Sequence, residues 1–191
     1  VAFEPVHSMR GHLKNSKRVN GFEHLEIREE AFGSEKRKAK IGINDVIEWS
    51  VLNDEGLPVR VLAIDDQSRN EIPDLIKIDI HGNELEVIKG AEELLKNHDP
   101  VLIISLEENK EHAEIEKILG ECGYGIYQYL PELGLFHECE IEDIAGNRNL
   151  VALKGEALQK VQKKGLLFNF DESVMDEIEG HEWKSLLREQ E

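Results

Sequence analysis

The pattern of hydrophobic and polar positions predicts alternating strands and helices in the central part of the chain. Residues 75–80 and 101–106 are nearly continuous apolar runs, which are typical of strands in a parallel sheet covered on both faces. Residues 83–97 and 111–122 instead carry apolar residues at helical spacing. Two more strands are expected at residues 125–130 and 149–153. This order predicts an α/β fold with a doubly wound, mostly parallel sheet.

The N-terminal part follows a less regular pattern. Residues 1–3 predict the end of a short buried strand, and residues 9–19 predict a helix. Asn20 and Gly21 should end that helix, because both tolerate a left-handed backbone. Alternation over residues 24–31 predicts another strand. Two strands of an antiparallel insertion and one further strand are expected at residues 40–44, 46–52 and 59–64.

The chain divides into a predicted α/β domain over residues 1–155 and a predicted helical tail over residues 156–191. The tail is expected to form two helical pieces. The apolar stripe of its second piece is expected to pack against the domain, as such stripes usually do.

Composition and charge exclude several classes of protein. The chain has 191 residues, a net charge of −17 and 40% hydrophobic residues, which is enough apolar material for a core. The acidity disfavours nucleic acid and anionic membranes as partners. No apolar run approaches the roughly 18–20 residues that a membrane span needs. Residues 1–40 depart from this acidity, with nine basic and six acidic side chains.

The two cysteines, Cys122 and Cys139, allow neither a disulfide framework nor a four-cysteine zinc site. We therefore expect a reducing, cytoplasmic setting. Neither cysteine has the histidine and acid partners of a catalytic nucleophile. The chain also lacks the glycine-rich phosphate loops and the nucleophile-elbow motif, and Gly120, Gly123 and Gly125 are interpreted as turn glycines.

Polar residues follow the predicted strands, and ligands of open α/β sheets bind beyond the carboxyl ends of the strands. Lys77 and Asp79 share one face of their strand, where burial is costly unless they pair or border a site. They are either a structural ion pair or a functional Asp79 at the strand tip. His81 is a candidate general base, although it could equally cap the next helix or lie in solvent. A metal site of Asp79, His81 and Glu84 would lack any known ligand spacing, and none is expected.

A family resemblance rests on four segments in a fixed order. Residues 73–95 read PDLIKIDIHGNELEVIKGAEELL. They resemble the strand "iKiDvEG" and helix "aElevlkGa" of the FkbM-type S-adenosylmethionine-dependent methyltransferases. Residues 1–5 (VAFEP) resemble that family's "aFEP" strand, residues 61–66 (VLAIDD) its "ttLDdl" segment, and residues 100–106 its next strand. The resemblance extends over residues 1–153.

The resemblance implies a Rossmann-like, class I methyltransferase fold that uses S-adenosylmethionine. It implies transfer of a methyl group to oxygen of a small molecule or glycan. Glu4 would bind the cofactor ribose, and Glu30 and Ala31 would approach adenine. Asp79, with Lys77 and His81 beside it, would lie near the transferred methyl group and relieve the acceptor hydroxyl of its proton.

Three departures from the family pattern open an alternative. The family's first strand and glycine-rich cofactor loop precede its "FEP" strand, so we expect this chain to lack them. His81 and Ser105 stand where the family usually has glutamates, although Glu107 could replace the second one. The alternative is a non-catalytic binding or assembly module. A sheet without its first strand would also expose an edge that favours pairing with a second copy.

Overall fold

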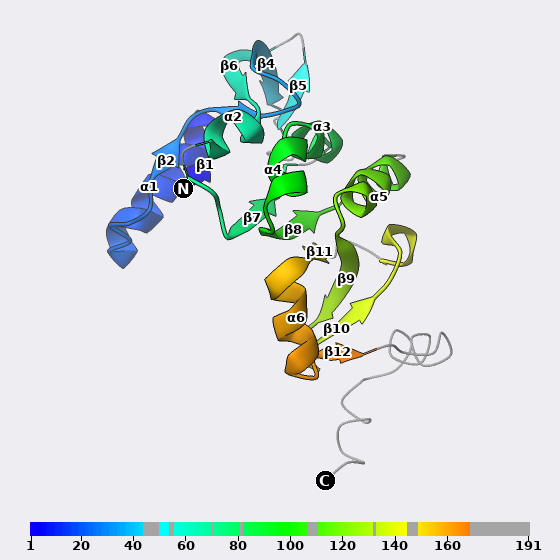
Figure 1. Ribbon diagram of the computed structural model, residues 1–191. Helices are drawn as coiled ribbons and strands as arrows, with labels where there is room; N and C mark the ends of the chain where they lie inside the picture. The colour runs from blue at the N-terminus through cyan, green and yellow to red at the C-terminus, as the bar shows by residue number, and fades with distance from the viewer. Residues whose placement is uncertain are drawn as a thin grey trace.

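The computed structural model describes residues 1–43, 50–53, 56–69, 71–80, 82–106, 111–131, 133–144 and 149–168 (Figure 1). Within these residues the chain forms a mixed α/β fold with three sheets. No helix in this part of the chain is long and apolar enough to cross a membrane.

The largest sheet has six strands in the order β12-β10-β9-β11-β8-β7. Strands β7 and β8 are parallel, but β11 runs antiparallel to both of its neighbours and β10 antiparallel to β9. The sheet is therefore mixed and not mostly parallel as expected: the parallel pairs β7–β8 and β10–β12 lie at its two ends, and antiparallel pairs lie between them. The strands are β7 (Leu75–Ile78), β8 (Val101–Ser105), β9 (Gly125–Leu130), β10 (Leu135–Glu138), β11 (Asn149–Leu153) and β12 (Leu167–Phe168).

Helices cover the two faces of this sheet unequally. The helices α3 (Glu84–Lys89), α4 (Glu92–Asn97) and α5 (His112–Glu121) bury their apolar residues in the main core with Ile104 and Leu150. On the opposite face, α6 (Gly155–Lys163) packs against a smaller cluster that includes Tyr127 and Val151. The helix predicted at residues 83–97 is interrupted between α3 and α4. The second predicted piece of the tail lies outside the described residues.

A separate two-stranded parallel sheet consists of β1 (Ala2–Phe3) and β2 (Ile27–Arg28), joined by α1 (His7–Asn20). Helix α1 matches the predicted helix and ends at Gly21, whose φ of 65° is the left-handed conformation expected there. The strand predicted at residues 24–31 is instead split. Its first part is β2, and its end enters another sheet as β3 (Ala31–Phe32).

The third sheet has the order β3-β6-β4-β5 and contains the predicted antiparallel insertion. Strands β4 (Arg37–Ile43) and β5 (Ser50–Asn53) are antiparallel, and β4 also pairs antiparallel with β6 (Leu57–Leu62). Strand β4 begins earlier than predicted because its first residues pair with the end of β6. Residues 44–49, which include the end of one predicted strand, the connection and the start of the next, lie outside the described part.

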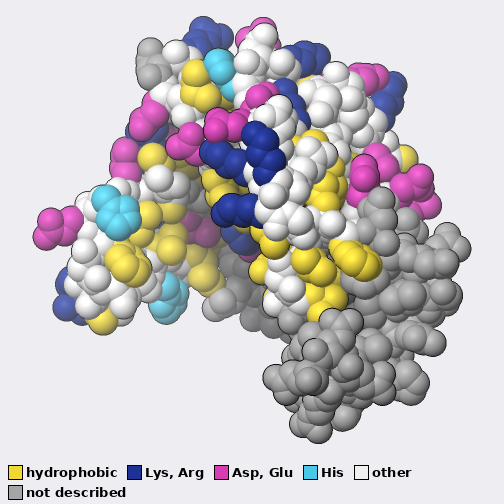
Figure 2. Space-filling model, turned by 60° about the horizontal axis from the view of Figure 1, so that its bottom comes forward, with side chains coloured by type: hydrophobic (Ala, Val, Ile, Leu, Met, Phe, Trp, Pro, Cys, Tyr) yellow, Lys and Arg dark blue, Asp and Glu magenta, His cyan; other side chains and the backbone are white. Residues whose placement is uncertain are grey.

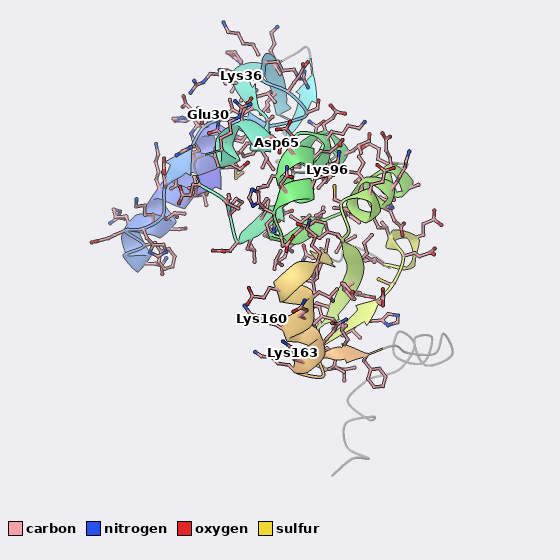
Figure 3. All side chains as sticks on the ribbon, in the orientation of Figure 1. Glu30, Lys36, Asp65, Lys96, Lys160 and Lys163 are labelled. Atoms are coloured by element: carbon pink, nitrogen blue, oxygen red, sulfur yellow. The ribbon has the colours of Figure 1, made fainter. Side chains whose placement is uncertain are left out.

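The third sheet meets the helices of the largest sheet at a close junction. A Cβ atom placed on Gly90 would lie only 2.1 Å from the carbonyl oxygen of Gly33, so no side chain fits there. Asp65, at the start of α2 (Ile64–Ser68), accepts hydrogen bonds from the N–H groups of Glu93 (3.0 Å) and Leu94 (2.8 Å). These bonds satisfy two of the unpaired N–H groups at the N-terminus of α4. Figure 3 shows Asp65 beside α4.

The face of β7 that carries Leu75, Lys77 and Asp79 is open, contrary to the expectation of cover on both faces. Leu75 is 53% exposed, whereas Ile78 on the other face is buried in the main core. The reason is that α3 and α4 pack on the Ile78 face, whereas the cluster under α6 on the other side contains no residue of β7. In Figure 2, hydrophobic side chains line the recess between the lobe on the left and the rest of the molecule.

We predict that Gly90→Ala destabilises the fold by about 1–3 kcal/mol, because the new methyl group must displace the backbone at Gly33. Urea unfolding followed by circular dichroism would measure this. Gly11→Ala is the matched control, because Gly11 lies within α1 and has open space around it. The control should stabilise by about 0.5–1 kcal/mol. Equal effects of the two changes would contradict the junction described above.

Candidate functional site

Asp79 lies just beyond the end of β7, on the open face of that strand. The Lys77 Nζ atom forms an ion pair with the Asp79 carboxylate, and both side chains are 48% exposed. The structural ion pair anticipated from the sequence is therefore present. Ion pairs this exposed contribute little to stability, so the pairing alone does not account for these two residues. The catalytic role of Asp79 and Lys77 stays a prediction.

The turn after β7 is held by a buried carboxylate. Glu84 is fully buried, and its two carboxylate oxygens accept hydrogen bonds from the N–H of Gly82, at 2.9 and 3.0 Å. Gly82 has a φ of 99°, which a residue with a side chain rarely adopts. Glu84 therefore has a structural role, because a buried carboxylate without hydrogen bonds would be costly. His81, the candidate base in this turn, lies outside the described residues.

Glu4 follows β1 and takes part in the turn that leads into α1. Its Oε1 atom accepts a hydrogen bond of 2.7 Å from the N–H of Val6, and its own N–H donates to the Arg28 carbonyl at 3.0 Å. Arg10 of α1 donates to the carbonyls of Glu4 (2.9 Å) and Pro5 (2.6 Å). The backbone around Glu4 is thus tied to α1 and β2.

Glu30 and Ala31 lie where the chain passes from β2 to β3. The Glu30 carboxylate forms an ion pair with Arg60 of β6, and the Glu30 side chain is only 13% exposed. Ala31 pairs with Val61 in the ladder between β3 and β6. Figure 3 shows Glu30 at this edge of the third sheet, not far from Lys36. The partner of Glu30 is 30 residues away, so no short motif in the sequence indicated it.

The structure separates the predicted site residues into two groups. Glu4, Glu30 and Ala31 belong to the N-terminal strands, whereas Lys77 and Asp79 belong to β7. Among the described residues, no hydrogen bond or ion pair joins Asp79 to Glu4 or Glu30. Across the part of the chain that the structure describes, no group of three or more His, Cys, Asp or Glu side chains could hold a metal ion.

Ser105 and the cysteines complete the set of predicted positions. Ser105 is the last residue of β8 and pairs with Asn149 of β11, while Glu107 lies outside the described residues. Cys122 is buried, and burial raises the pKa of its thiol. A raised pKa leaves little thiolate at neutral pH, which is unsuited to a nucleophile.

The sequence analysis did not single out Lys154, which has a structural role. Lys154 is mostly buried and donates hydrogen bonds to the carbonyls of Leu95 (2.5 Å) and Cys122 (3.1 Å) at the C-terminal ends of α4 and α5. It also forms an ion pair of 3.2 Å with Asp99. A cation is favoured at helix C-termini, so Lys154 joins two helices to the end of β11.

Fold and site together define a mixed α/β protein with acidic side chains just beyond the ends of β1 and β7. The sequence model of the Methyltransferase FkbM domain matches residues 2–126, which is more than half of the chain. The chain therefore belongs to the FkbM methyltransferase domain family, and the resemblance noted in the sequence is confirmed.

A solved structure and the curated proteins provide two further comparisons. The chain is similar to the crystal structure of methyltransferase FkbM from Methylobacillus flagellatus KT, with a TM-score of 0.52 and 21% sequence identity. The similarity covers 80% of this chain and 35% of that chain, so it spans about a third of the other protein's length. At this identity the likeness concerns the fold. No curated protein matches the chain.

We predict that Asp79→Asn changes the free energy of unfolding by less than about 1 kcal/mol, because its ion pair is half exposed. Glu84→Ala should cost about 1–3 kcal/mol, because it leaves the Gly82 N–H without its acceptor. Urea unfolding of both variants would measure the difference. A larger loss for Asp79→Asn than for Glu84→Ala would show that Asp79 is the structural residue of this turn.

Proposed function

We propose that the protein is an S-adenosylmethionine-dependent methyltransferase that acts on a hydroxyl oxygen of a small molecule or glycan. The observation that carries this proposal is the family match over residues 2–126, which contains the exposed carboxylate of Asp79 at the end of β7. Because the chain spans about a third of the solved relative, the activity of the whole protein is part of the proposal.

The residues near Glu4 fit a cofactor that carries a ribose. One carboxylate oxygen of Glu4 accepts from the N–H of Val6, and the second is the acceptor we assign to a ribose hydroxyl. The fit of Glu30 is poorer, because Arg60 already engages its carboxylate. We therefore assign Glu4 to the ribose and only the backbone at Glu30 and Ala31 to adenine.

Asp79 is the group we assign to the acceptor. When bound, S-adenosylmethionine supplies an electrophilic methyl group on a sulfonium centre. The chain's own contribution would be to accept the proton that the acceptor hydroxyl loses as its oxygen attacks. Lys77 would hold the Asp79 carboxylate at the end of β7 through their ion pair. His81, two residues further along the chain, remains a second candidate base.

We further propose that β1 and β7 flank the position of one additional parallel strand of a doubly wound, Rossmann-like sheet. Strand β1 is parallel to β2, β7 is parallel to β8, and each is the last strand of its sheet. Leu75 of β7 and Ile72 just before it are about half exposed, which suits a surface that the segments connected to such a strand would cover. The loop after such a strand would contribute backbone N–H donors for the cofactor.

The competing proposal is a non-catalytic module that has kept the family fold. It is favoured by Ser105 and His81, which replace two acids that the family resemblance places at the site. In such a module Asp79 would still pair with Lys77, but no methyl transfer would depend on it.

Calorimetric titration with S-adenosylmethionine would test the cofactor assignment. This chain should be compared with a version that includes the coding sequence upstream of Val1. We expect binding to the longer version, and we expect Glu4→Gln to weaken it about tenfold, the effect of losing a hydrogen bond to a charged group. Glu23→Gln, a change at an exposed residue outside the site, is the control. Absence of binding to either version would contradict the proposal.

Methyl transfer by the longer version would distinguish the enzyme from the module. The readout is formation of S-adenosylhomocysteine in the presence of candidate hydroxyl acceptors. We expect Asp79→Asn to lower the turnover about 100-fold or more, because it removes the proposed base. Cofactor binding with no turnover in any acceptor pool, and no change on Asp79→Asn, would favour the module.

A further inference from the structure

A basic groove lies between α1, β2 and the third sheet, away from Asp79. It consists of two adjoining hollows of about 360 and about 340 Å³, which share the side chains of Arg10, Glu29 and Arg60. Both hollows are open to solvent, so charge and not enclosure would hold a ligand there. The charged residues of the basic groove are Arg10, Lys14, Arg28, Lys38, Arg60, Glu29 and Glu30.

The charge of the basic groove is opposite to that of the chain as a whole. Five cations and two carboxylates line it, in a chain with a net charge of −17. Glu30 pairs with Arg60, and Glu29 lies 3.6 Å from Arg10. Among the described residues, no hydrogen bond or ion pair engages the exposed ammonium groups of Lys14 and Lys38. Arg28 is paired with Glu26 at 2.7 Å, so the positive charge that remains unneutralised in the groove is chiefly that of Lys14 and Lys38.

Two of these cations face each other directly across a strand pair. Lys38 of β4 is the register partner of Arg60 of β6 in their antiparallel ladder. Like charges at directly opposed positions destabilise a sheet, and the ion pair of Arg60 with Glu30 offsets only part of that repulsion, because Glu30 does not pair with Lys38. A bound anion between the two side chains would offset that cost.

The Arg10 side chain is fixed in position by hydrogen bonds before any anion binds. Its Nη1 atom donates to the carbonyls of Glu4 and Pro5, and the side chain is only 13% exposed. An arginine fixed in this way loses little conformational freedom when it binds an oxyanion, and its planar guanidinium matches phosphate geometry. Lys14 and Lys38 can then approach from either side of the groove.

We propose that the basic groove binds a phosphate-bearing small molecule, with Arg10, Lys14, Lys38 and Arg60 as the residues that contact the phosphate. S-adenosylmethionine does not meet this requirement, because it carries no phosphate and its sulfonium is positively charged. The groove adjoins the proposed cofactor site, because Glu30 lines it and Arg10 donates to the Glu4 carbonyl. Its phosphate contacts do not depend on the methyl-transfer proposal.

Isothermal titration of this chain with glucose 1-phosphate, inorganic phosphate and glucose would test the site. We expect glucose 1-phosphate to bind with a dissociation constant of about 1 mM or lower, and binding to weaken as salt increases. Inorganic phosphate should bind more weakly, and glucose should not bind. Equal affinity for the two phosphates would overturn the assignment to a phosphate-bearing molecule, and absence of binding by glucose 1-phosphate at about 10 mM would overturn the site.

The double variant Lys14→Gln/Lys38→Gln locates the binding. Both lysines are exposed, so the substitutions should leave the circular dichroism spectrum unchanged. The unfolding midpoint should not fall, and it should rise slightly if Lys38 repels Arg60. We expect at least a tenfold loss of affinity for glucose 1-phosphate. Lys163→Gln, at an exposed lysine of α6, is the matched control and should bind like the original chain. Unchanged affinity in the double variant would overturn the proposal.

Discussion

The contact between Gly33 and Gly90 determines how the N-terminal strands meet the largest sheet. A backbone oxygen occupies the space that a side chain on Gly90 would need, so the spacing is set by covalent geometry and not by adjustable packing. Asp65 adds three hydrogen bonds across the same junction, and Phe32 packs against the main core. The relative position of Glu4 and Asp79 depends on this junction, because each lies on a different side of it.

Several residues of the segments that resemble the family have structural roles at or near this junction. Within the signature region, Gly90 allows the close approach and Glu84 holds the turn after β7. The Asp65 carboxylate, in the upstream segment that resembles "ttLDdl", caps α4. These roles require no ligand, so a chain can match the family through them whatever its activity. Asp79 is different, because its half-exposed carboxylate contributes little to the fold. The family match therefore supports the fold through Gly90, Glu84 and Asp65, whereas Asp79 is the one residue among these four that points to methyl transfer.

The sequence predicted those features that depend on neighbours along the chain. Helix α1 and its end at Gly21 follow from local spacing, and so do β8 and β9. Strand β12 was missed because it is short and pairs with β10, about 30 residues earlier. Strand β10 was missed although it forms a hairpin with β9, because its four residues show no clear alternation of apolar and polar positions. At the site, the Lys77–Asp79 pair was anticipated because its partners are two residues apart, whereas the Glu30–Arg60 pair spans 30 residues. The expected cover of β7 was wrong because it depends on which helices pack over each face, and the local sequence pattern does not show that.

Charge separates the two proposed ligands. The carboxylates of Glu4 and Asp79 suit a cofactor with a positive sulfonium centre, whereas Lys14 and Lys38 suit an anion. Glu30 lies at the border, and its pairing with Arg60 removes one carboxylate from the first site and moderates the charge of the second. An acidic protein with one basic groove would repel most anions over its surface and concentrate them at that groove. Charge alone can therefore direct the sulfonium cofactor to the carboxylates and the phosphate-bearing molecule to the basic groove, whatever the shape of each site.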